Sequence, residues 1–278
     1  MHREDPHRRL AESVGEELHA AGLAQEECKA LLDQLPSKWE RFSDVVLLPG
    51  SAFREEWDIH ASEGLWSAVS EALKVDRVAR LGEISGEMRE SSVEMLLGED
   101  DWVVRRESGV DYGYNLTQCM FSAGNVNERR RMGEVAGAGE VVVDLYAGIG
   151  YYSLPILVHS RVDHVHCCEW NPNAVRALES NLESNGVAGR CTIHVGDNRV
   201  TATKLEGVAD RVVLGLLPSA GDGYGLAMAA LRPAGGVLHV HGVAAAGDYA
   251  AWADGVTGSL REMGGGCSFD AAEPLRVK

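Results

Sequence analysis

The sequence predicts an α/β protein with a parallel-rich sheet covered by helices on both faces, preceded by a smaller α+β domain. Two observations support this fold class. From about residue 141 onward, short apolar runs alternate with longer amphipathic segments, as in strands joined by crossover helices. Before that point, strand-like and helix-like segments follow one another without regular alternation. The second pattern is typical of a small α+β unit.

The N-terminal domain is expected over residues 1–135. Its first 35 residues carry leucine and valine at helical spacing among many charges, which predicts an amphipathic helical start. Strand-like runs at 45–48 and 102–104 flank a helix-like stretch at 64–73. The tract 133–140 is rich in glycine and alanine, and the boundary with a second domain is expected there.

The second domain, residues 136–278, is expected to form the parallel sheet. Its predicted strands are 141–145, 164–169, 191–197, 211–217 and 236–241. Its predicted helices are 152–159, 171–185, 224–231 and 246–263. Four helices thus alternate with five strands, which fits a parallel sheet covered on both faces.

The composition excludes several classes of protein. A hydrophobic content of 45% over 278 residues is ample for a buried core. No run reaches the roughly 18 apolar residues that a membrane helix needs, so a cytoplasmic protein without membrane contact is expected. The six cysteines form no C-x-x-C pair, and the spacing of His164, His166, Cys167, Cys168 and Cys191 is that of strand alternation. No metal is expected.

The net charge of −16 argues against non-specific adhesion to nucleic acid. A polyanion would therefore need a restricted groove. The best local candidate is Arg129-Arg130-Arg131, with Arg105-Arg106 upstream, although such runs are more often solvated helix faces.

Polar residues and glycines follow the first three predicted strands of the second domain. Gly148 and Gly150 permit a tight turn after the first strand. Glu169 ends the second strand and is placed to accept hydrogen bonds from ribose hydroxyls, while Asp197 and Asn198 follow the third strand and suit an adenine edge. Because ligands bind beyond the carboxyl ends of parallel strands, these residues predict a nucleoside-type cofactor site.

A dinucleotide site is the main alternative for this glycine loop. Tyr151, Tyr152 and Ser153 put bulk where a pyrophosphate needs close approach to a helix N-terminus, which disfavours a nicotinamide oxidoreductase. Asp144, which ends the first strand, is counted among the cofactor-binding residues and is expected to order the loop.

Several runs of the sequence together resemble one family, the tRNA wybutosine-synthesising aminocarboxypropyltransferases. The runs are Met120-Phe-Ser-Ala-Gly-Asn125, Glu128-Arg129, Asp144-Leu-Tyr-Ala-Gly-Ile-Gly-Tyr-Tyr152, Cys168-Glu-Trp-Asn-Pro172, Gly196-Asp-Asn-Arg199 and Gly215-Leu-Leu-Pro-Ser219. The resemblance implies a Rossmann-like fold of the class I methyltransferase type. It also implies transfer of the 3-amino-3-carboxypropyl group from S-adenosyl-L-methionine to 4-demethylwyosine at position 37 of phenylalanine tRNA.

The resemblance also assigns cofactor contacts, which fall on Ser122, Arg129, Glu169 and the pair Asp197-Asn198. Arginine suits a carboxylate because its planar fork can bind two oxygens at once. Ser122 and Arg129 are therefore expected to fix the amino-acid portion of the cofactor. Glu169 and Asp197 are expected to fix its nucleoside.

The segment after the fourth strand separates this family from its relatives, the tRNA guanine-37 N1-methyltransferases. Those relatives carry Asn-Pro-Pro where this sequence has Leu217-Pro218-Ser219, which favours aminocarboxypropyl transfer. Leu217, Pro218 and Ser219 are expected on the substrate side, with Tyr151 and Tyr152. Position 37 lies in the single-stranded anticodon loop, whose bases can be stacked on aromatic side chains, and Tyr146 and Trp170 are further stacking candidates.

Two alternatives remain beside aminocarboxypropyl transfer: guanine-37 N1-methylation and a catalytically silent cofactor-binding subunit. The family continues past the position of Val277-Lys278 into a final strand, so the resemblance implies that this sequence is truncated or does without that strand. Asp144, His239 and His241 lie at strand ends, but none of them is identified as a catalytic base.

Overall fold

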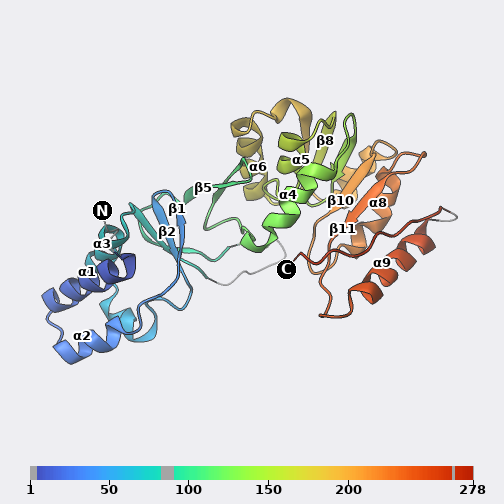
Figure 1. Cartoon of the computed structure of the whole chain (residues 1–278). Coiled ribbons are helices and arrows are strands. Elements are labelled where there is room, and N and C mark those ends of the chain that lie inside the picture. The colour runs from blue at the N-terminus through green and yellow to red at the C-terminus, as the bar shows by residue number, and fades with distance from the viewer. Residues whose placement is uncertain (1–4, 83–90, 265–266, 278) are drawn as a thin grey trace. The chain divides into compact units, whose positions relative to one another are not determined.

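The computed structural model describes residues 5–82, 91–264 and 267–277. The chain divides into two compact units, each built around its own core (Figure 1). The first comprises residues 1–105 and 114–120, and the second residues 106–113 and 121–278. Residues 1–4 of the expected helical start and Lys278 lie outside the described residues.

The first unit packs helices against a four-stranded sheet in the order β1-β2-β3-β4. Its strands are β1 (Glu40–Phe42), β2 (Val45–Leu48), β3 (Arg77–Arg80) and β4 (Glu94–Leu97), and its helices are α1 (Pro6–Ala20), α2 (Gln25–Leu32), the 3-10 helix η1 (Glu55–His60) and α3 (Glu63–Leu73). Strands β2 and β3 are parallel, and the other two pairs are antiparallel. The expected small α+β unit is present.

Helix α1 shows why this unit folds as the sequence indicates. Asp5 caps the helix by accepting a hydrogen bond from the His7 backbone, and proline occupies its first turn. Leu10, Val14 and Leu18 recur on one face and are almost completely buried, in the core that α1 shares with α3.

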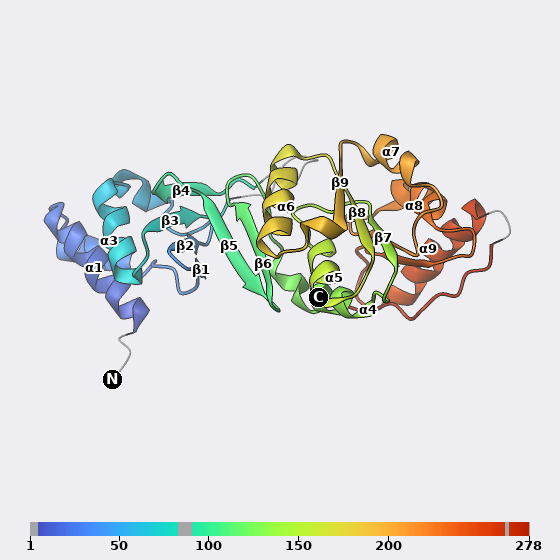
Figure 2. The ribbon, with the colours of Figure 1, turned by 90° about the horizontal axis from the view of Figure 1, so that it is seen from above.

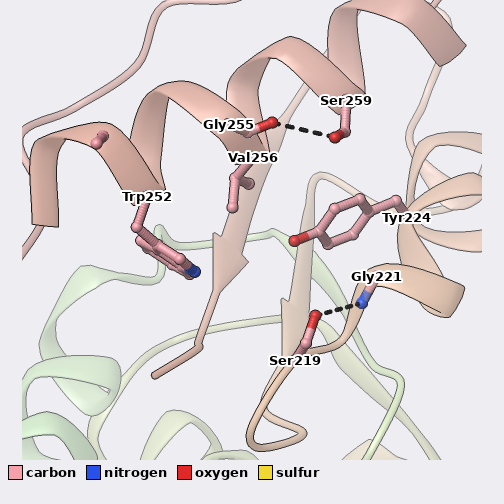
Figure 3. A pocket seen from close by; sticks show the side chains of 8 residues that line it. Ser219, Gly221, Tyr224, Trp252, Gly255, Val256 and Ser259 are labelled. Carbon is pink, nitrogen blue, oxygen red and sulfur yellow. Dashed lines mark hydrogen bonds between the residues drawn. The ribbon is translucent and has the colours of Figure 1, made fainter. Parts of the chain in front are cut away.

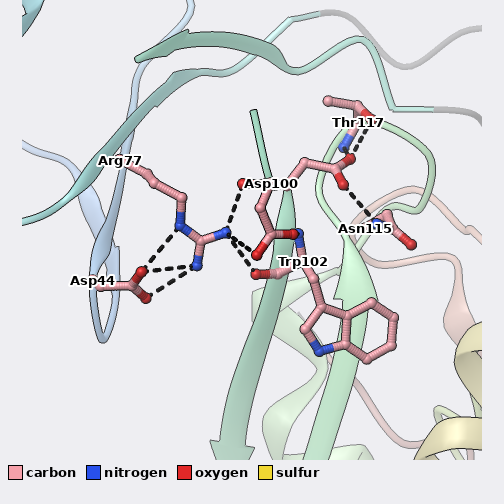
Figure 4. A network of polar contacts seen from close by, with 7 residues as sticks. Asp44, Arg77, Asp100, Trp102, Asn115 and Thr117 are labelled. Atoms are coloured by element: carbon pink, nitrogen blue, oxygen red, sulfur yellow. Dashed lines mark hydrogen bonds and ion pairs between the residues drawn. The ribbon is translucent and has the colours of Figure 1, made fainter. Parts of the chain in front are cut away.

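A polar network fixes the edge of the first unit (Figure 4). The Arg77 guanidinium binds both carboxylate oxygens of Asp44, at 3.0 and 3.1 Å, and donates to the backbone carbonyls of Asp100 and Trp102. The neighbouring Asp101 accepts hydrogen bonds from Asn115 and from both the backbone and the hydroxyl of Thr117. Arginine suits this position because its planar fork serves several acceptors at once.

Strands β5 (Trp102–Glu107) and β6 (Val110–Asn115) form a two-stranded sheet that belongs to both units. The chain enters the second unit after Arg105 and returns to the first after Gly113. Ser108 and Gly109 join the strands, and both have positive φ, at 51° and 82°. Two such residues form the tight hairpin turn that matches the twist of the flanking strands.

The second unit contains a five-stranded parallel sheet in the order β11-β10-β7-β8-β9. Its strands are β7 (Val141–Asp144), β8 (His164–Glu169), β9 (Cys191–Val195), β10 (Arg211–Leu214) and β11 (Val237–Val240). Its helices are α4 (Val126–Val135), α5 (Ser153–His159), α6 (Pro172–Ser184), α7 (Asn198–Thr201), α8 (Tyr224–Ala230) and α9 (Tyr249–Met263), with 3-10 turns η2 (Ala123–Asn125), η3 (Ala188–Arg190), η4 (Ala202–Leu205) and η5 (Gly221–Gly223).

The predicted α/β fold class is confirmed in this unit. Helices α4, α5 and α6 lie on one face of the sheet, and α7, α8 and α9 lie on the other (Figures 1 and 2). Strand order runs outward from β7 through β8 to β9, and then β10 returns to the other side of β7. The carboxyl ends of β7, β8 and β10 therefore surround the switch point at which parallel sheets bind ligands.

The division between the two units falls at a different place in the sequence from the expected boundary near residue 135. Helix α4 packs on α5 and belongs to the second unit, as do residues 106–113 of the hairpin. At Gly133 an added Cβ would lie 2.9 Å from the Pro155 carbonyl oxygen, so a glycine permits the close approach of the two helices. The tract 133–140 thus ends α4 and leads into β7 within one unit.

Across the described residues, no helix combines the length and apolar character needed to cross a bilayer.

Candidate functional site

The site is built around the loop that leaves β7. Gly148 and Gly150 have φ of 57° and 100°, in the region that L-residues rarely adopt. An added Cβ would lie 2.5 Å from the Tyr151 ring at Gly148 and 2.6 Å from Leu154 Cγ at Gly150. The glycines are therefore required by the turn itself and by the side chains packed around it.

Glu169, the last residue of β8, holds this loop. Its Oε2 accepts a hydrogen bond of 2.7 Å from the Gly148 backbone, and its Oε1 accepts from the backbones of Trp170 and Asn171, at 3.0 and 2.8 Å. Burial raises the pKa of this carboxyl group. A carboxylate offers about four acceptor positions, so Oε2 keeps a position for one further donor.

Asp144 joins the two ends of the same loop from within the core. The residue is fully buried, and its two carboxylate oxygens accept from the Ser153 hydroxyl at 2.7 Å and from the Tyr146 backbone at 3.2 Å. Burial raises the pKa of Asp144 to about 6. Its position favours a role in ordering the loop over contact with a ligand.

The structure separates the roles of Asp197 and Asn198, which follow β9. Asp197 caps α7 through the Arg199 backbone at 2.9 Å and forms an ion pair with the Arg199 guanidinium. The Asn198 amide donates a hydrogen bond of 2.9 Å to the carbonyl of Leu145, the residue just after β7. Asn198 thus joins the glycine loop, whereas the Asp197 carboxylate is bound by its own neighbour.

Ser122 and Arg129 lie together, and their surroundings were not expected. The Arg129 guanidinium is buried and binds both carboxylate oxygens of Glu107, at 2.6 and 2.7 Å. It also donates a hydrogen bond of 2.9 Å to the Ser122 carbonyl. The carboxylate that fills the arginine fork is therefore the protein's own, and sequence reasoning missed it because Glu107 lies 22 residues away in the hairpin.

Aromatic contacts connect this arginine to the glycine loop. The Arg129 guanidinium lies 4.5 Å from the centre of the Phe121 ring, and Phe121 in turn packs against Tyr151 with ring centres 5.9 Å apart. Tyr112 contacts Phe121 from the other side at 5.4 Å. Cation–π and edge contacts of this kind link Arg129, through Phe121, to Tyr151.

The remaining aromatic candidates differ in exposure. Tyr152 is 7% exposed and stacks on His241, with ring centres 4.6 Å apart and planes 10° from parallel. Burial raises its pKa. Trp170, directly after Glu169, is 43% exposed and so presents an aromatic face to solvent. Of these two, Trp170 is the one available to stack on a base.

His239 and His241 belong to a buried polar network between α4 and β11. Glu128 accepts hydrogen bonds from Arg131 at 2.6 Å and from His241 at 3.0 Å. Burial opposes ionisation of Glu128, but these two donors outweigh it and lower the pKa to about 2. His239 lies 2.6 Å from the Arg211 guanidinium, and burial lowers its pKa to about 4.

Leu217, Pro218 and Ser219 follow β10 and are tied to the chain after β11. The Val243 backbone donates a hydrogen bond of 3.1 Å to the Pro218 carbonyl, and Ser219 forms an antiparallel β-bridge with Gly242. The Leu217-Pro218 peptide bond is cis.

Asn181 of α6 and Asn185, the residue that caps the end of this helix, attach the hairpin to the site. Asn181 is buried. Its Oδ1 accepts a hydrogen bond of 2.6 Å from the Gly113 backbone. Its Nδ2 donates hydrogen bonds of 3.0 Å to the carbonyls of Gly113 and Ile149. One turn later, Asn185 makes the same paired contacts with the backbone of Asp111. Only Asn181 also reaches the glycine loop, because Ile149 lies between its two glycines.

Comparison with known families identifies the family to which the chain belongs. Residues 103–249, more than half of the chain, match the family model described as the TRM5/TYW2 methyltransferase domain, and residues 20–101 match the TYW2 N-terminal domain. The chain belongs to the TRM5/TYW2 methyltransferase family. The resemblance inferred from the sequence motifs is confirmed.

Relatives of this TRM5/TYW2 family member include two curated proteins and a solved structure. It is 46% identical over 259 residues to tRNA wybutosine-synthesizing protein 2/3/4 of Arabidopsis thaliana, covering 93% of this chain and 25% of that protein. It is 48% identical over 209 residues to the Homo sapiens tRNA wybutosine-synthesizing protein 2 homolog, covering 74% and 46%. The crystal structure of P. horikoshii TYW2 in complex with MeSAdo is 32% identical, with a TM-score of 0.65, covering 78% of this chain and 75% of that one.

This chain therefore spans a quarter to about half of the length of these curated relatives.

Exchange of Asn181 for aspartate tests whether this side chain clamps the hairpin and glycine loop together. Asn181→Asp removes the donor to two buried carbonyls, each costing about 1–3 kcal/mol when unsatisfied, so a loss of about 3 kcal/mol in unfolding free energy is expected. Asn185→Asp is the matched control: it also removes a donor to two carbonyls, those of Asp111 and Asn181, but both bonds are only partly buried, so a loss of about 1 kcal/mol is expected. Urea denaturation of both variants measures the difference. Equal losses would contradict the special role of Asn181.

The buried Asp144 predicts a dependence of stability on pH. Its folded pKa of about 6 exceeds the ordinary value of 3.8, so its contribution is fully present below pH 3.8 and is lost as pH rises through 6. The variant Asp144→Asn keeps a neutral group at every pH. Its stability relative to the wild type should therefore rise by about 2 kcal/mol between pH 4 and pH 7, as measured by urea denaturation. A constant difference over this range would show that Asp144 ionises normally.

Proposed function

We propose that this chain transfers the 3-amino-3-carboxypropyl group from S-adenosyl-L-methionine to 4-demethylwyosine at position 37 of phenylalanine tRNA, a step of wybutosine biosynthesis. The observation that carries this proposal is the match of residues 20–101 to the TYW2 N-terminal domain, beside the catalytic domain of the same family. The curated relatives bear wybutosine-synthesizing names. A cytoplasmic location is part of the proposal.

The residues at the carboxyl ends of the strands fit a nucleoside sulfonium cofactor. Glu169 keeps an acceptor position on Oε2 for a ribose hydroxyl, and Trp170 presents an exposed aromatic face beside it. Asn198 lies at the same edge, held to Leu145. Positive φ at Gly148 and Gly150 turns the loop tightly, so a ligand can approach its backbone closely.

The geometry around Arg129 refines the expected grip on the amino-acid portion of the cofactor. Because Glu107 fills the arginine fork, we assign Arg129 the task of holding Ser122 in place through its carbonyl. Ser122 then contacts the amino-acid portion directly. Asp197, bound to Arg199, is assigned to capping α7.

When bound, the cofactor supplies a sulfur with three activated carbons, so orientation decides which group moves. Ser122 would hold the amino-acid portion of the cofactor and Glu169 its ribose, and together they would set which carbon on sulfur faces the acceptor. The Leu217-Pro218-Ser219 segment lines the substrate side without the amide that an Asn-Pro-Pro motif offers to a guanine edge. This absence favours a tricyclic acceptor over guanine.

The proposal is tested by incubating the chain with S-adenosyl-L-methionine and phenylalanine tRNA that carries 4-demethylwyosine. Nucleoside mass analysis should show gain of one aminocarboxypropyl group, and methylthioadenosine should appear as the small product. Phenylalanine tRNA with guanosine at position 37 is the control and should stay unchanged. Gain of a methyl group by the guanosine-37 control tRNA, with release of S-adenosylhomocysteine, would assign guanine-37 N1-methylation instead. Cofactor binding without any transfer would assign a silent binding subunit.

A further inference from the structure

A pocket of about 450 Å³ opens next to Ser219, between the end of β10 and helices α8 and α9 (Figure 3). The residues that line it are Ser219, Gly221, Tyr224, Ala251, Trp252, Gly255, Val256 and Ser259. None of these eight described residues is charged. Uncharged pockets with a few placed polar groups are typical sites for neutral, largely apolar ligands.

Tyr224 contributes a phenol hydroxyl to the lining of the pocket. The side chain belongs to a residue that is only 6% exposed, and its hydroxyl is directed into the pocket (Figure 3). Among the described residues, no hydrogen-bond partner for this hydroxyl is found. Because the hydroxyl faces the open pocket, its proton is available to an acceptor atom on a ligand.

Two serine hydroxyls complete the polar lining. Ser219 Oγ accepts 3.2 Å from the Gly221 backbone, which leaves its own proton free to donate to a ligand. Ser259 Oγ donates a hydrogen bond of 3.0 Å to the Gly255 carbonyl, which leaves the lone pairs of the serine oxygen free to accept. The pocket thus offers both donors and an acceptor, around the apolar surfaces of Trp252 and Val256.

This combination fits a planar heterocycle with hydrogen-bonding edges. Indole rings stack on nucleobases whatever their sequence, and the hydroxyls can pair with the base edge. Stacking depends little on charge, so it provides RNA affinity that a chain of net charge −16 does not gain readily from phosphate contacts.

We propose that this pocket binds a nucleobase of the RNA substrate, stacked on Trp252 and hydrogen-bonded by Tyr224. This inference rests on the proposed function. The occupant is a neighbour of the modified base, because the modified base must reach the cofactor. None of the residues assigned to the cofactor lines this pocket, whereas Ser219 connects it to the substrate side of the site.

Gly255 allows a direct test because the space around it is open. A Cβ added there would meet no atom within 4 Å, and replacement of a helical glycine does not disturb α9. Gly255→Leu therefore fills the pocket with a side chain. Gly258→Leu is the matched control, since Gly258 is on the same helix, is equally open and does not line the pocket.

The measurement is the affinity for phenylalanine tRNA carrying 4-demethylwyosine, by fluorescence anisotropy and as KM in the transfer assay. Gly255→Leu should weaken tRNA binding by about tenfold, the scale of one lost base stack, and Tyr224→Phe by about threefold. Gly258→Leu should bind tRNA as the wild type does. All three variants should keep wild-type affinity for S-adenosyl-L-methionine.

Equal tRNA affinity of Gly255→Leu and Gly258→Leu, with normal transfer by the wild type, would overturn the pocket assignment and leave the proposed function intact. Failure of the wild type itself to bind tRNA would overturn both. A loss of cofactor affinity in Gly255→Leu would also contradict a pocket reserved for RNA.

Discussion

One carboxylate, that of Glu169, holds the site together. It accepts three backbone hydrogen bonds, one of them from Gly148, and so fixes the end of β8 to the loop that leaves β7. Asn198 adds the end of β9 through the Leu145 carbonyl. Because backbone groups donate all three bonds to Glu169, the loop keeps one shape and places an acceptor oxygen at the switch point of the sheet.

Buried polar pairs support this centre from outside the sheet. Asn181 binds Gly113 and the loop residue Ile149 from α6, while Glu107 fills the fork of Arg129 on α4. Each group would be costly to bury alone, and each has hydrogen-bond partners within the unit. The hairpin and α4 therefore belong to the unit that carries the glycine loop, and the functional site depends on residues far from the strand ends.

Features that depend on periodicity or on position at a strand end could be predicted from the sequence. Parallel strands are apolar runs, so all five were located, and Gly148 and Glu169 could be proposed as site residues because they come at the ends of such runs. Contacts such as Asn181 with Gly113, 68 residues apart, leave no local pattern. For the same reason the glycine-rich tract at 133–140 suggested a domain boundary, although packing of α4 on α5 joins both sides of it in one unit.

Calorimetric titration of S-adenosyl-L-methionine tests the role of Glu169 most directly. Glu169→Gln exchanges one acceptor oxygen for a donor, so the wild type should bind and this variant should lose about 1–3 kcal/mol of binding free energy. Glu183→Gln, at an exposed position on α6, is the matched control and should bind normally. Thermal denaturation verifies that each variant is folded. Unchanged affinity in a folded Glu169→Gln, or no binding by the wild type, would contradict a cofactor site centred on Glu169.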